Sequence, residues 1–399
     1  MNNTYFLPAN ILLPKGDFEK WAVVACDQYT SEPEYWKEVE KTVGNEPSAL
    51  NLILPEVYLS ADNSNRIEKI NRTMTDYLEN GVFREIENTF IYLEREVTGE
   101  KIRKGVVGLI DLENYSYEKG SKALIRATEA TVLERIPPRV LIRKDAKLEM
   151  PHVMLLIDDP KCTVIEPLEE KINGFEKLYD FGLMQQSGHI KGYSVDDETA
   201  EQIQNALSAL VENTEDKLLF AVGDGNHSLA TAKECYNLNK TENSRYALVE
   251  IVNIHDTSLE FEPIYRVVFG VEPEKFIENF VTALGGEYFG MDAQKFTCVY
   301  GDSKREVSLK PTGKLAVATL QTYLDEYLKQ NKNVSIDYIH GEDVVYSLCK
   351  AENTVGFIFE GMQKSELFDA IKQDGSLPRK TFSMGHAADK RFYIEARKL

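Results

Sequence analysis

The chain has 399 residues, of which 43% are hydrophobic, and its formal net charge is −19 at pH 7. This length provides room for two or three domains, and the hydrophobic content, with 20 Tyr and 18 Phe, indicates packed cores and excludes a disordered chain. The acidic balance argues against a nucleic-acid-binding surface, because such a surface requires a basic patch.

The five cysteines are dispersed and odd in number, so the sequence suggests neither a disulfide framework nor a zinc site. Residues 1–20 lack the charged and apolar regions of a signal peptide, and no apolar run has the length of a transmembrane helix. We therefore expect a cytoplasmic protein with reduced thiols and no membrane partner. The composition does not indicate an oligomeric state.

Hydrophobic periodicity predicts a mixture of helices and strands in the first part of the chain. We expect strands at 20–28, 90–96, 106–111, 139–143 and 153–157, and helices at 32–41, 63–80, 121–135 and 196–211. Pro137 and Pro138 are expected to end the helix at 121–135, because proline lacks the N–H group that a helix interior needs.

Further strands are predicted at 245–253 and 264–269, and the sequence changes character beyond Glu272. There we expect helices at 276–284, 322–329, 343–351 and 365–373, and extended runs at 296–300, 306–309, 314–319 and 355–359. Because helices do not alternate strictly with strands, the predicted class is α+β with a mixed-sheet core. Residues 1–270 are predicted to form the main domain and 271–399 a smaller C-terminal α+β subdomain, whose last segment returns to the main domain.

The most informative segment is Leu218–Ser228, in which a buried strand leads into a turn with the sequence Gly-Asp-Gly-Asn-His-Ser and then into a helix. Gly223 and Gly225 permit a sharp turn and the close approach of another group. The first amides of a helix have no internal partner, and together with the helix dipole they suit a phosphate or a carboxylate. The alternative is a capped turn with Asn226 or Ser228 as the N-cap.

Two ionisable residues stand at the rim of this turn. Asp224 is a candidate Mg²⁺ ligand or general base, and the alternative is an Asx turn that binds its own loop. His227 is a candidate phosphate donor or acid–base group near neutral pH, and the alternative is a packed core histidine. Asn226 and Ser228 suit the role of N-cap and the role of phosphate donor equally.

Several basic residues outside the turn suit an anion. A guanidinium fork binds phosphate or carboxylate well, but a structural salt bridge to the abundant acidic residues is an equal alternative. Glu129 lies three residues after Arg126, so an intrahelical pair is its alternative role. The candidate anion-binding residues are Arg126, Arg139, Arg143, Arg266 and Lys380.

With these motifs in view, the chain resembles the family known as domain of unknown function 1015 over nearly its whole length. The turn at 221–228 resembles that family's Ala-Asp-Gly-His-His-Arg turn, with Asn226 and Ser228 replacing the first His and the Arg. The segments 125–139, 263–266 and 377–382 resemble its His-Glu-x-Thr, Pro-Thr-His-Arg and Pro-Pro-Lys-Ser-Thr segments, with Thr128 in place of His.

A more distant likeness, confined to the turn, exists to the ParB/sulfiredoxin-like superfamily, which includes the free-serine kinases. It implies ParB/sulfiredoxin-like character in part of the fold, and a phosphotransferase that uses Mg²⁺ with ATP or ADP on a small hydroxyl compound. Asp224, His227 and Glu129 would then be catalytic, with Asp224 the metal ligand. The phosphate ligands would be Gly223, Gly225, Asn226, Ser228 and the basic residues named above.

The alternative function is a non-catalytic sensor that binds a nucleotide or another small ligand, and Ser228 in place of Arg and Asn226 in place of His favour it. A small-molecule partner is expected, whereas nucleic acid, zinc, haem and flavin are not. If the resemblance holds, Asp224, His227, Glu129, Arg139 and Arg266 converge on one cleft.

Overall fold

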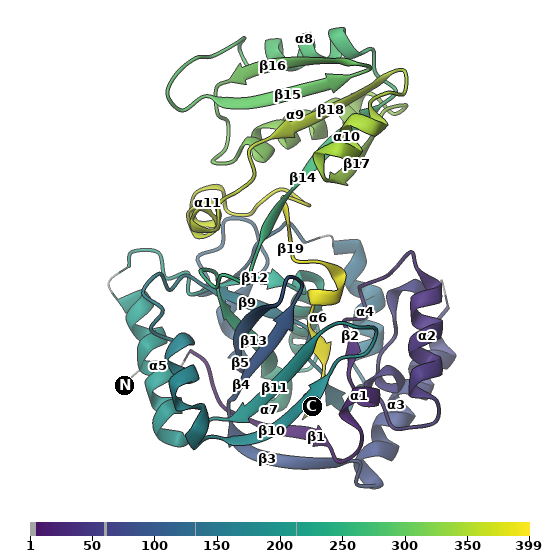
Figure 1. Cartoon of the computed structure of the whole chain (residues 1–399), viewed down its shortest axis with the longest axis vertical. Coiled ribbons are helices and arrows are strands. Elements are labelled where there is room, and N and C mark those ends of the chain that lie inside the picture. Colours follow the sequence, from purple (N-terminus) through teal and green to yellow (C-terminus); the bar gives the residue numbers. More distant parts are fainter. Residues whose placement is uncertain (1–4, 60–61, 132, 213) are drawn as a thin grey trace. The chain divides into compact units, whose positions relative to one another are not determined.

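The computed structural model describes residues 5–59, 62–131, 133–212 and 214–399 (Figure 1). The chain divides into two compact units. Unit 1 comprises residues 1–259 and 385–399, and unit 2 comprises residues 260–384. The predicted domain boundary lies near residue 270, whereas the structure passes from unit 1 to unit 2 after Leu259.

A mixed sheet forms the centre of unit 1, and its described residues make nine strands. Strand pairs β12–β7, β13–β9 and β6–β7 are parallel and the remaining neighbours are antiparallel. In spatial order the strands are β10 (Glu176–Gly182), β11 (His189–Ser194), β4 (Ile91–Val97), β5 (Lys101–Asp111), β13 (Tyr246–Asn253), β9 (Met154–Ile157), β12 (Phe220–Asp224), β7 (Ile125–Ala127) and β6 (Tyr115–Ser116).

Three small strand pairs attach the chain termini and the loops to this sheet. They are β1 (Ala9–Pro14) with β3 (Phe83–Thr89), β2 (Val23–Val24) with β20 (Phe392–Tyr393), and β8 (Leu148–Glu149) with β21 (Arg397–Lys398). Through β20 and β21 the end of the chain is thus part of unit 1.

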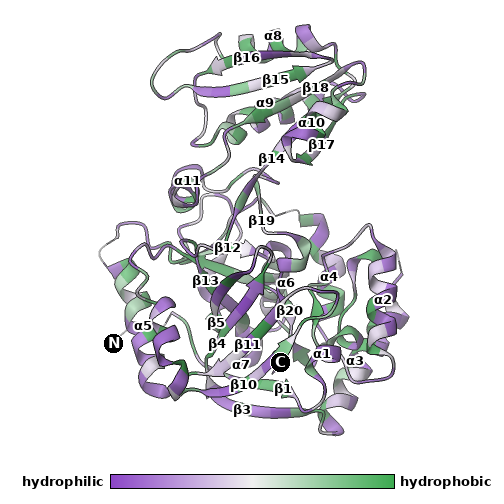
Figure 2. Cartoon of the chain, in the orientation of Figure 1, coloured by the Kyte–Doolittle hydropathy of each residue, from purple (hydrophilic) through white to green (hydrophobic). Residues whose placement is uncertain are grey.

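Alternate residues of the central strands enter two separate cores, so both faces of the sheet are buried. On β4, for example, Leu93 packs into one core and Tyr92 into the other. The helices of unit 1 cover these faces, and α5 shows both hydrophobic and hydrophilic residues in Figure 2. The helices are α1 (Phe18–Trp21), α2 (Pro33–Val43), α3 (Ser64–Glu79), α4 (Ile136–Arg143), α5 (Asp197–Glu212), α6 (Asn226–Leu238) and α7 (Glu242–Arg245).

Short 3₁₀ turns complete unit 1. They are η1 (Ala49–Leu52), η2 (Glu56–Tyr58), η3 (Leu112–Asn114), η4 (Leu133–Arg135), η5 (Glu166–Gly174) and η7 (Ala387–Asp389).

Unit 2 has its own antiparallel sheet and its own core of aromatic rings packed edge to face, in which Phe280 lies 5.6 Å from Phe296 and 5.4 Å from Phe357 between ring centroids. Its strands are, in spatial order, β16 (Ser303–Leu309), β15 (Gln294–Tyr300), β18 (Thr354–Phe359), β14 (Phe261–Phe269) and β17 (Ser335–His340), with β19 (Phe382–Met384) paired to β14. Its helical elements are α8 (Pro273–Ala283), α9 (Ala316–Gln330), α10 (Glu342–Leu348), η6 (Lys364–Glu366) and α11 (Leu367–Asp374).

The α+β class and the mixed-sheet core are confirmed, with 36% of residues helical and 30% in strands. Most predicted elements are present, but four predictions are wrong. Residues 20–28 form the end of α1 and the short strand β2, not one strand, and the run 314–319 lies partly in α9. In the described part of the chain, no helix combines the length and apolarity needed to cross a bilayer.

The other two errors concern the segment that approaches the site. The predicted helix at 121–135 contains the strand β7 and the turn η4, because residues 125–127 pair in parallel with β12 (Val132 lies outside the described residues). The predicted strand at 139–143 is the second half of α4. Pro137 and Pro138 begin this helix rather than end the preceding one, since proline is tolerated in a first turn whose N–H groups have no internal partner.

Candidate functional site

The predicted turn joins β12 to α6, and both of its glycines are required by packing. Gly225 has a φ of 83°, and a Cβ atom there would lie 3.1 Å from both Cα and Cγ2 of Val153. A Cβ atom at Gly223 would lie 2.8 Å from Cγ of Leu156. A larger residue at either position would push the turn away from β9, so the glycines let the backbone pack closely there.

The start of α6 offers backbone donors. Gly225 is the N-cap and supplies no capping side chain. Within the described residues, no hydrogen bond reaches the amide N–H groups of Asn226, His227 and Ser228, and the helical ladder begins with the N–H of Leu229 bonded to the Gly225 carbonyl at 3.0 Å. These donors and the positive end of the helix dipole suit an anion.

Asn226 holds the turn to the end of β7. Its Oδ1 accepts a hydrogen bond from the N–H of Thr128 at 3.2 Å, and its Nδ2 donates to Thr128 Oγ1 at 3.2 Å. Thr128 Oγ1 in turn donates to the carbonyl of Val222 at 2.7 Å. Because Glu129 follows Thr128 directly, the backbone of this predicted catalytic residue lies at the same edge of the sheet as the turn.

Asp224 faces the C-terminal segment. One of its carboxylate oxygens accepts the N–H of Gly225 at 2.9 Å, and the other lies 3.3 Å from Nζ of Lys390. The two side chains are only 18% and 14% exposed, so solvent screens this ion pair less than a surface pair. The lysine comes from the returning end of the chain.

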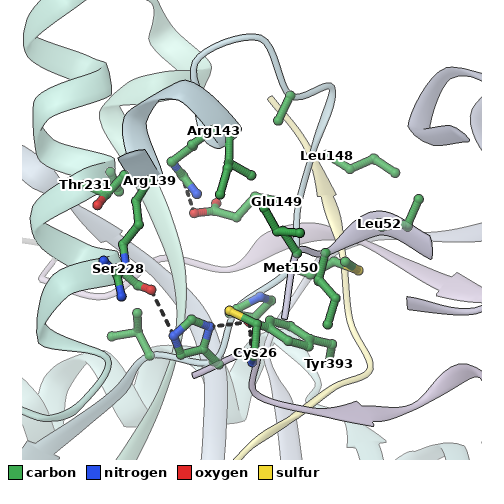
Figure 3. A pocket seen from close by; sticks show the side chains of 18 of the residues that line it. Cys26, Leu52, Arg139, Arg143, Leu148, Glu149, Met150, Ser228, Thr231 and Tyr393 are labelled. Carbon is green, nitrogen blue, oxygen red and sulfur yellow. Dashed lines mark hydrogen bonds and ion pairs between the residues drawn. The ribbon is translucent and has the colours of Figure 1, made fainter. Parts of the chain in front are cut away.

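A hydrogen-bonded chain of side chains crosses from the turn to the C-terminal segment (Figure 3). Ser228 Oγ lies 2.8 Å from Nε2 of His152, and Nδ1 of His152 lies 2.6 Å from the hydroxyl of Tyr393. His152 directly precedes the buried residue Val153 and is itself 7% exposed. The imidazole is therefore fixed at both nitrogens by residues from two distant segments.

Asp27 lies close to the same group of side chains. Burial raises the pKa of this carboxyl, but the nearby His152, a hydrogen bond from Gln28 and the charge of Lys390 outweigh burial, so the pKa is lowered overall. Asp27 is therefore ionised at neutral pH, and it supplies a negative charge near His152 and Lys390.

His227 carries the clearest electrostatic perturbation in the turn. Burial, together with the positive charges of Arg139 and Arg135, lowers the pKa of His227 to about 4, and Asp27 opposes this shift. Its Nε2 atom is buried and has no hydrogen-bond partner among the described residues. At pH 7 the imidazole is thus neutral and sits in a positive field with an unused polar atom, an environment that favours an anion.

A cavity of about 150 Å³ opens beside the turn, and Figure 3 shows Ser228, Thr231, Tyr393 and Cys26 around it. An apolar cavity of this volume holds one aromatic ring. Much of its wall is apolar, from Leu52, Leu54, Met74, Ile142, Leu148, Met150, Val153, Leu229 and Leu248.

Two predicted anion-binding arginines line this cavity, and both are paired with carboxylates. Arg139 forms an ion pair with Glu56. Arg143 lies 2.6 Å from one oxygen of Glu149, whose other oxygen lies 2.5 Å from Nε of Arg397. A ligand anion at Arg139 or Arg143 would share the guanidinium with the existing carboxylate.

The remaining predicted residues are used elsewhere. Arg126, on β7, pairs with Asp216. Arg266 and Lys380 belong to unit 2, where the buried Arg266 guanidinium donates to the carbonyls of Arg379 and Lys380 at 3.0 and 2.9 Å. These contacts of Arg266 organise the chain of unit 2.

A metal site requires several ligand side chains that converge on one point. Over the described ranges, no group of three or more His, Cys, Asp or Glu side chains is arranged to hold a metal ion. Mg²⁺ is commonly bound by one or two carboxylates together with water and substrate phosphates. Asp224 fits that minimal role only, as one carboxylate that would have to leave Lys390.

Comparison with known proteins identifies the family. The chain matches the model of a protein family of unknown function (DUF1015) over residues 7–393, so it belongs to that family, as the sequence motifs predicted. No curated protein matches the chain.

Several solved structures are distantly similar. A conserved hypothetical protein from Pyrococcus furiosus is 12% identical with a TM-score of 0.35, over 73% of this chain and 94% of that one. A free serine kinase in complex with AMP is 14% identical with a TM-score of 0.40, over 75% and 94%. A C-terminally truncated SbnI from Staphylococcus aureus is 12% identical with a TM-score of 0.36, over 72% and 82%. At these identities and TM-scores, function has to be inferred from the residues of this chain.

Four residues of the site were not among the predicted site residues: His152, Tyr393, Lys390 and Asp27. Of these, only Asp27 carried a local signal, because it stands at the end of a predicted strand. His152 and Tyr393 are 241 residues apart in the chain, and they meet where the C-terminal segment pairs with β2 and β8. No local spacing could have connected them.

Proposed function

We propose that unit 1 binds a small organic phosphate, with ATP and ADP as the first candidates, and transfers its phosphoryl group to a small hydroxyl compound. The observation that carries this proposal is that the donor-bearing turn adjoins a ring-sized apolar cavity, with Ser228 belonging to both. One ring of a planar base would occupy the cavity while phosphate oxygens accept hydrogen bonds from the turn.

The charges around the turn support an anionic ligand. Burial lowers the pKa of His227, and the nearby Arg139 and Arg135 lower it further, so these two arginines place positive charge near the turn. Lys390 adds an ammonium group within 3.3 Å of Asp224 and would neutralise charge on a transferred phosphoryl group. Phosphoryl transfer depends mainly on such positioning and electrostatic stabilisation, with little covalent chemistry from the protein.

Asp224 is assigned the carboxylate role in this chemistry. Once phosphate competes for Lys390, Asp224 would accept the proton of the substrate hydroxyl or bind a Mg²⁺ ion that also contacts the phosphates. Glu129 is assigned to the acceptor side, since its backbone lies at the same sheet edge.

Thermal unfolding of the full chain with ATP, ADP or CTP, with and without Mg²⁺, tests the binding part. A ligand at one hundred times its dissociation constant should stabilise the native state by about 2.7 kcal/mol, seen as a rise in Tm. Absence of a shift with every nucleotide would contradict the proposal.

A non-catalytic sensor is the second candidate, and the pairing of Asp224 with Lys390 favours it, since the carboxylate is already neutralised. Asp224→Asn separates the two functions, with the exposed turn variant Asp302→Asn as its matched control. Loss of phosphoryl transfer with nucleotide binding retained indicates the enzyme. A change in affinity without any turnover in the unmodified chain indicates the sensor.

A further inference from the structure

Ser228 has the surroundings of a nucleophile, which phosphate binding does not require. It is the third residue of α6, and its hydroxyl lies 2.8 Å from Nε2 of His152. A hydroxyl within hydrogen-bond reach of an imidazole, with that imidazole oriented by a third group, is the geometry of an activated serine. Here the third group is the hydroxyl of Tyr393, 2.6 Å from Nδ1.

The hydrogen bonds of Tyr393 bear on which nitrogen of His152 carries the proton. The Tyr393 hydroxyl oxygen accepts the backbone N–H of Cys26 at 3.3 Å. Burial raises the pKa of Cys26 to about 12, so the sulfur stays a thiol. In the tautomer that a general base requires here, Nδ1–H of His152 donates to the Tyr393 oxygen, so that the Nε2 lone pair faces Ser228.

The charge that develops on His152 also has a partner. Asp27 is ionised and lies near the imidazole. It would stabilise an imidazolium ion, as the carboxylate does in a serine–histidine–aspartate triad, although it acts here through space and beside Tyr393. The N–H groups at the start of α6, which have no partner in the described ranges, would stabilise an oxyanion formed next to Ser228.

We propose that Ser228 is a catalytic nucleophile and His152 its general base, and that the site cleaves small carboxylic esters with an apolar acyl group. The cavity beside Ser228 specifies the acyl group, because its wall is largely apolar and its volume of about 150 Å³ admits one ring. This activity goes beyond the proposed phosphoryl transfer and does not depend on it.

The steps balance without any further reactant except water. Ser228 Oγ attacks the carbonyl carbon and passes its proton to His152 Nε2, while the carbonyl electron pair moves to oxygen. The bond to the alcohol oxygen then breaks, and His152 returns the proton to the leaving alkoxide. Water attacks the acyl carbon, its proton goes to His152 and then to Ser228 Oγ, and the acid leaves.

Labelling of the full chain with an alkyl fluorophosphonate, followed by peptide mass spectrometry, tests the nucleophile directly. We expect one phosphonyl group per chain at Ser228, no labelling of Ser228→Ala, and unchanged labelling of Ser347→Ala, which alters an exposed helical serine. His152→Gln should slow the labelling about 10²-fold or more, the usual contribution of a general base. Labelling absent from Ser228 in the unmodified chain overturns the proposal.

Ester hydrolysis and folding are measured separately. p-Nitrophenyl benzoate should be hydrolysed with a burst of one nitrophenolate per chain, and Ser228→Ala should lose this activity while its Tm stays near that of the unmodified chain. If His152→Gln does not fold, the role of His152 is tested instead by the rate at which iodoacetamide alkylates the cysteine of Ser228→Cys. Alkylation no faster than that of Ser347→Cys would contradict the assignment of His152 as general base. Nucleotide-induced thermal shifts are scored independently, so either proposal can fail alone.

Discussion

His227 makes the free energy of unfolding depend on pH. Its pKa is about 4 in the folded chain, whereas an unfolded histidine titrates near 6.5, so the unfolded state binds the proton more readily. The stabilisation linked to neutral His227 is therefore complete above pH 6.5 and is lost as the pH falls toward 4. We expect the urea midpoint to fall less between pH 7 and pH 5 in His227→Gln than in the unmodified chain.

His189 supplies the control for that measurement. It is a half-exposed histidine bonded to Asp180 at 2.6 Å, away from the turn. His189→Gln should not reduce the fall in the urea midpoint between the two pH values. An equal fall in the midpoint for His227→Gln and the unmodified chain would show that His227 is not responsible.

Gly225 tests how strictly the turn is determined by one residue. Alanine there must adopt a φ of 83° and place its Cβ 3.1 Å from Val153, which combines left-handed strain with a close contact. We expect Gly225→Ala to lower the free energy of unfolding by about 1–3 kcal/mol in urea titrations. Gly174→Ala, where a Cβ meets no atom within 4 Å, should change it far less. Similar effects at the two positions would contradict this account of the turn.

At the scale of elements, sequence reasoning succeeded where the information is local. The strand, the two glycines and the helix of the turn follow one another at 218–238, so periodicity and residue type were sufficient. It failed at α4, because Pro137 and Pro138 are compatible with the end of one helix and with the start of the next. The difference lies in the pairing of β7 with β12, whose residues are distant in sequence.

The same distinction applies to the site. The proximity of Asp224, His227 and Ser228 could be predicted because they share one turn. The side chains that contact Asp224 and Ser228 come from the segment before β9 and from the C-terminal segment. These contacts cannot be predicted from a single sequence, because they depend on strand pairing and buried ion pairs between segments that are distant in the chain.

A buried charge cluster attaches the C-terminal segment to unit 1. Arg391 lies 2.6 Å from Glu250 and 2.5 Å from Glu395, and all three side chains are 2% exposed or less. Its Nε also donates to the carbonyl of Pro151 at 3.1 Å, next to His152. We expect Arg391→Met to cost about 3–5 kcal/mol in denaturant unfolding, because buried Glu395 loses its cation and buried Glu250 keeps only Arg103, at 3.5 Å.

An exposed pair gives the reference for this cost. Arg72 and Glu68 lie 2.7 Å apart on α3, and both side chains are well exposed. Arg72→Met should change stability by no more than about 1 kcal/mol. If Arg391→Met is as mild as Arg72→Met, the cluster does not anchor the segment.

At the scale of the whole molecule, the chain leaves unit 1 at Leu259 and returns at Gly385. The returning residues supply β20, β21, Lys390, Arg391 and Tyr393, so unit 1 cannot complete its core or its site from residues 5–259 alone. Unit 2 is continuous in sequence and has its own sheet and aromatic core, within the size range of independently folding domains.

We therefore expect opposite results from two truncations. A fragment of residues 260–384 should unfold cooperatively and give a dispersed ¹H–¹⁵N NMR spectrum, because all the strands and rings of its core are retained. A chain ending at Met384 should keep that unit 2 spectrum but lose the dispersed signals of unit 1, because Glu250 would be buried without Arg391 and β2 would lack its partner strand. Native unit 1 signals in the chain that ends at Met384 would show that the returning segment is dispensable for the fold.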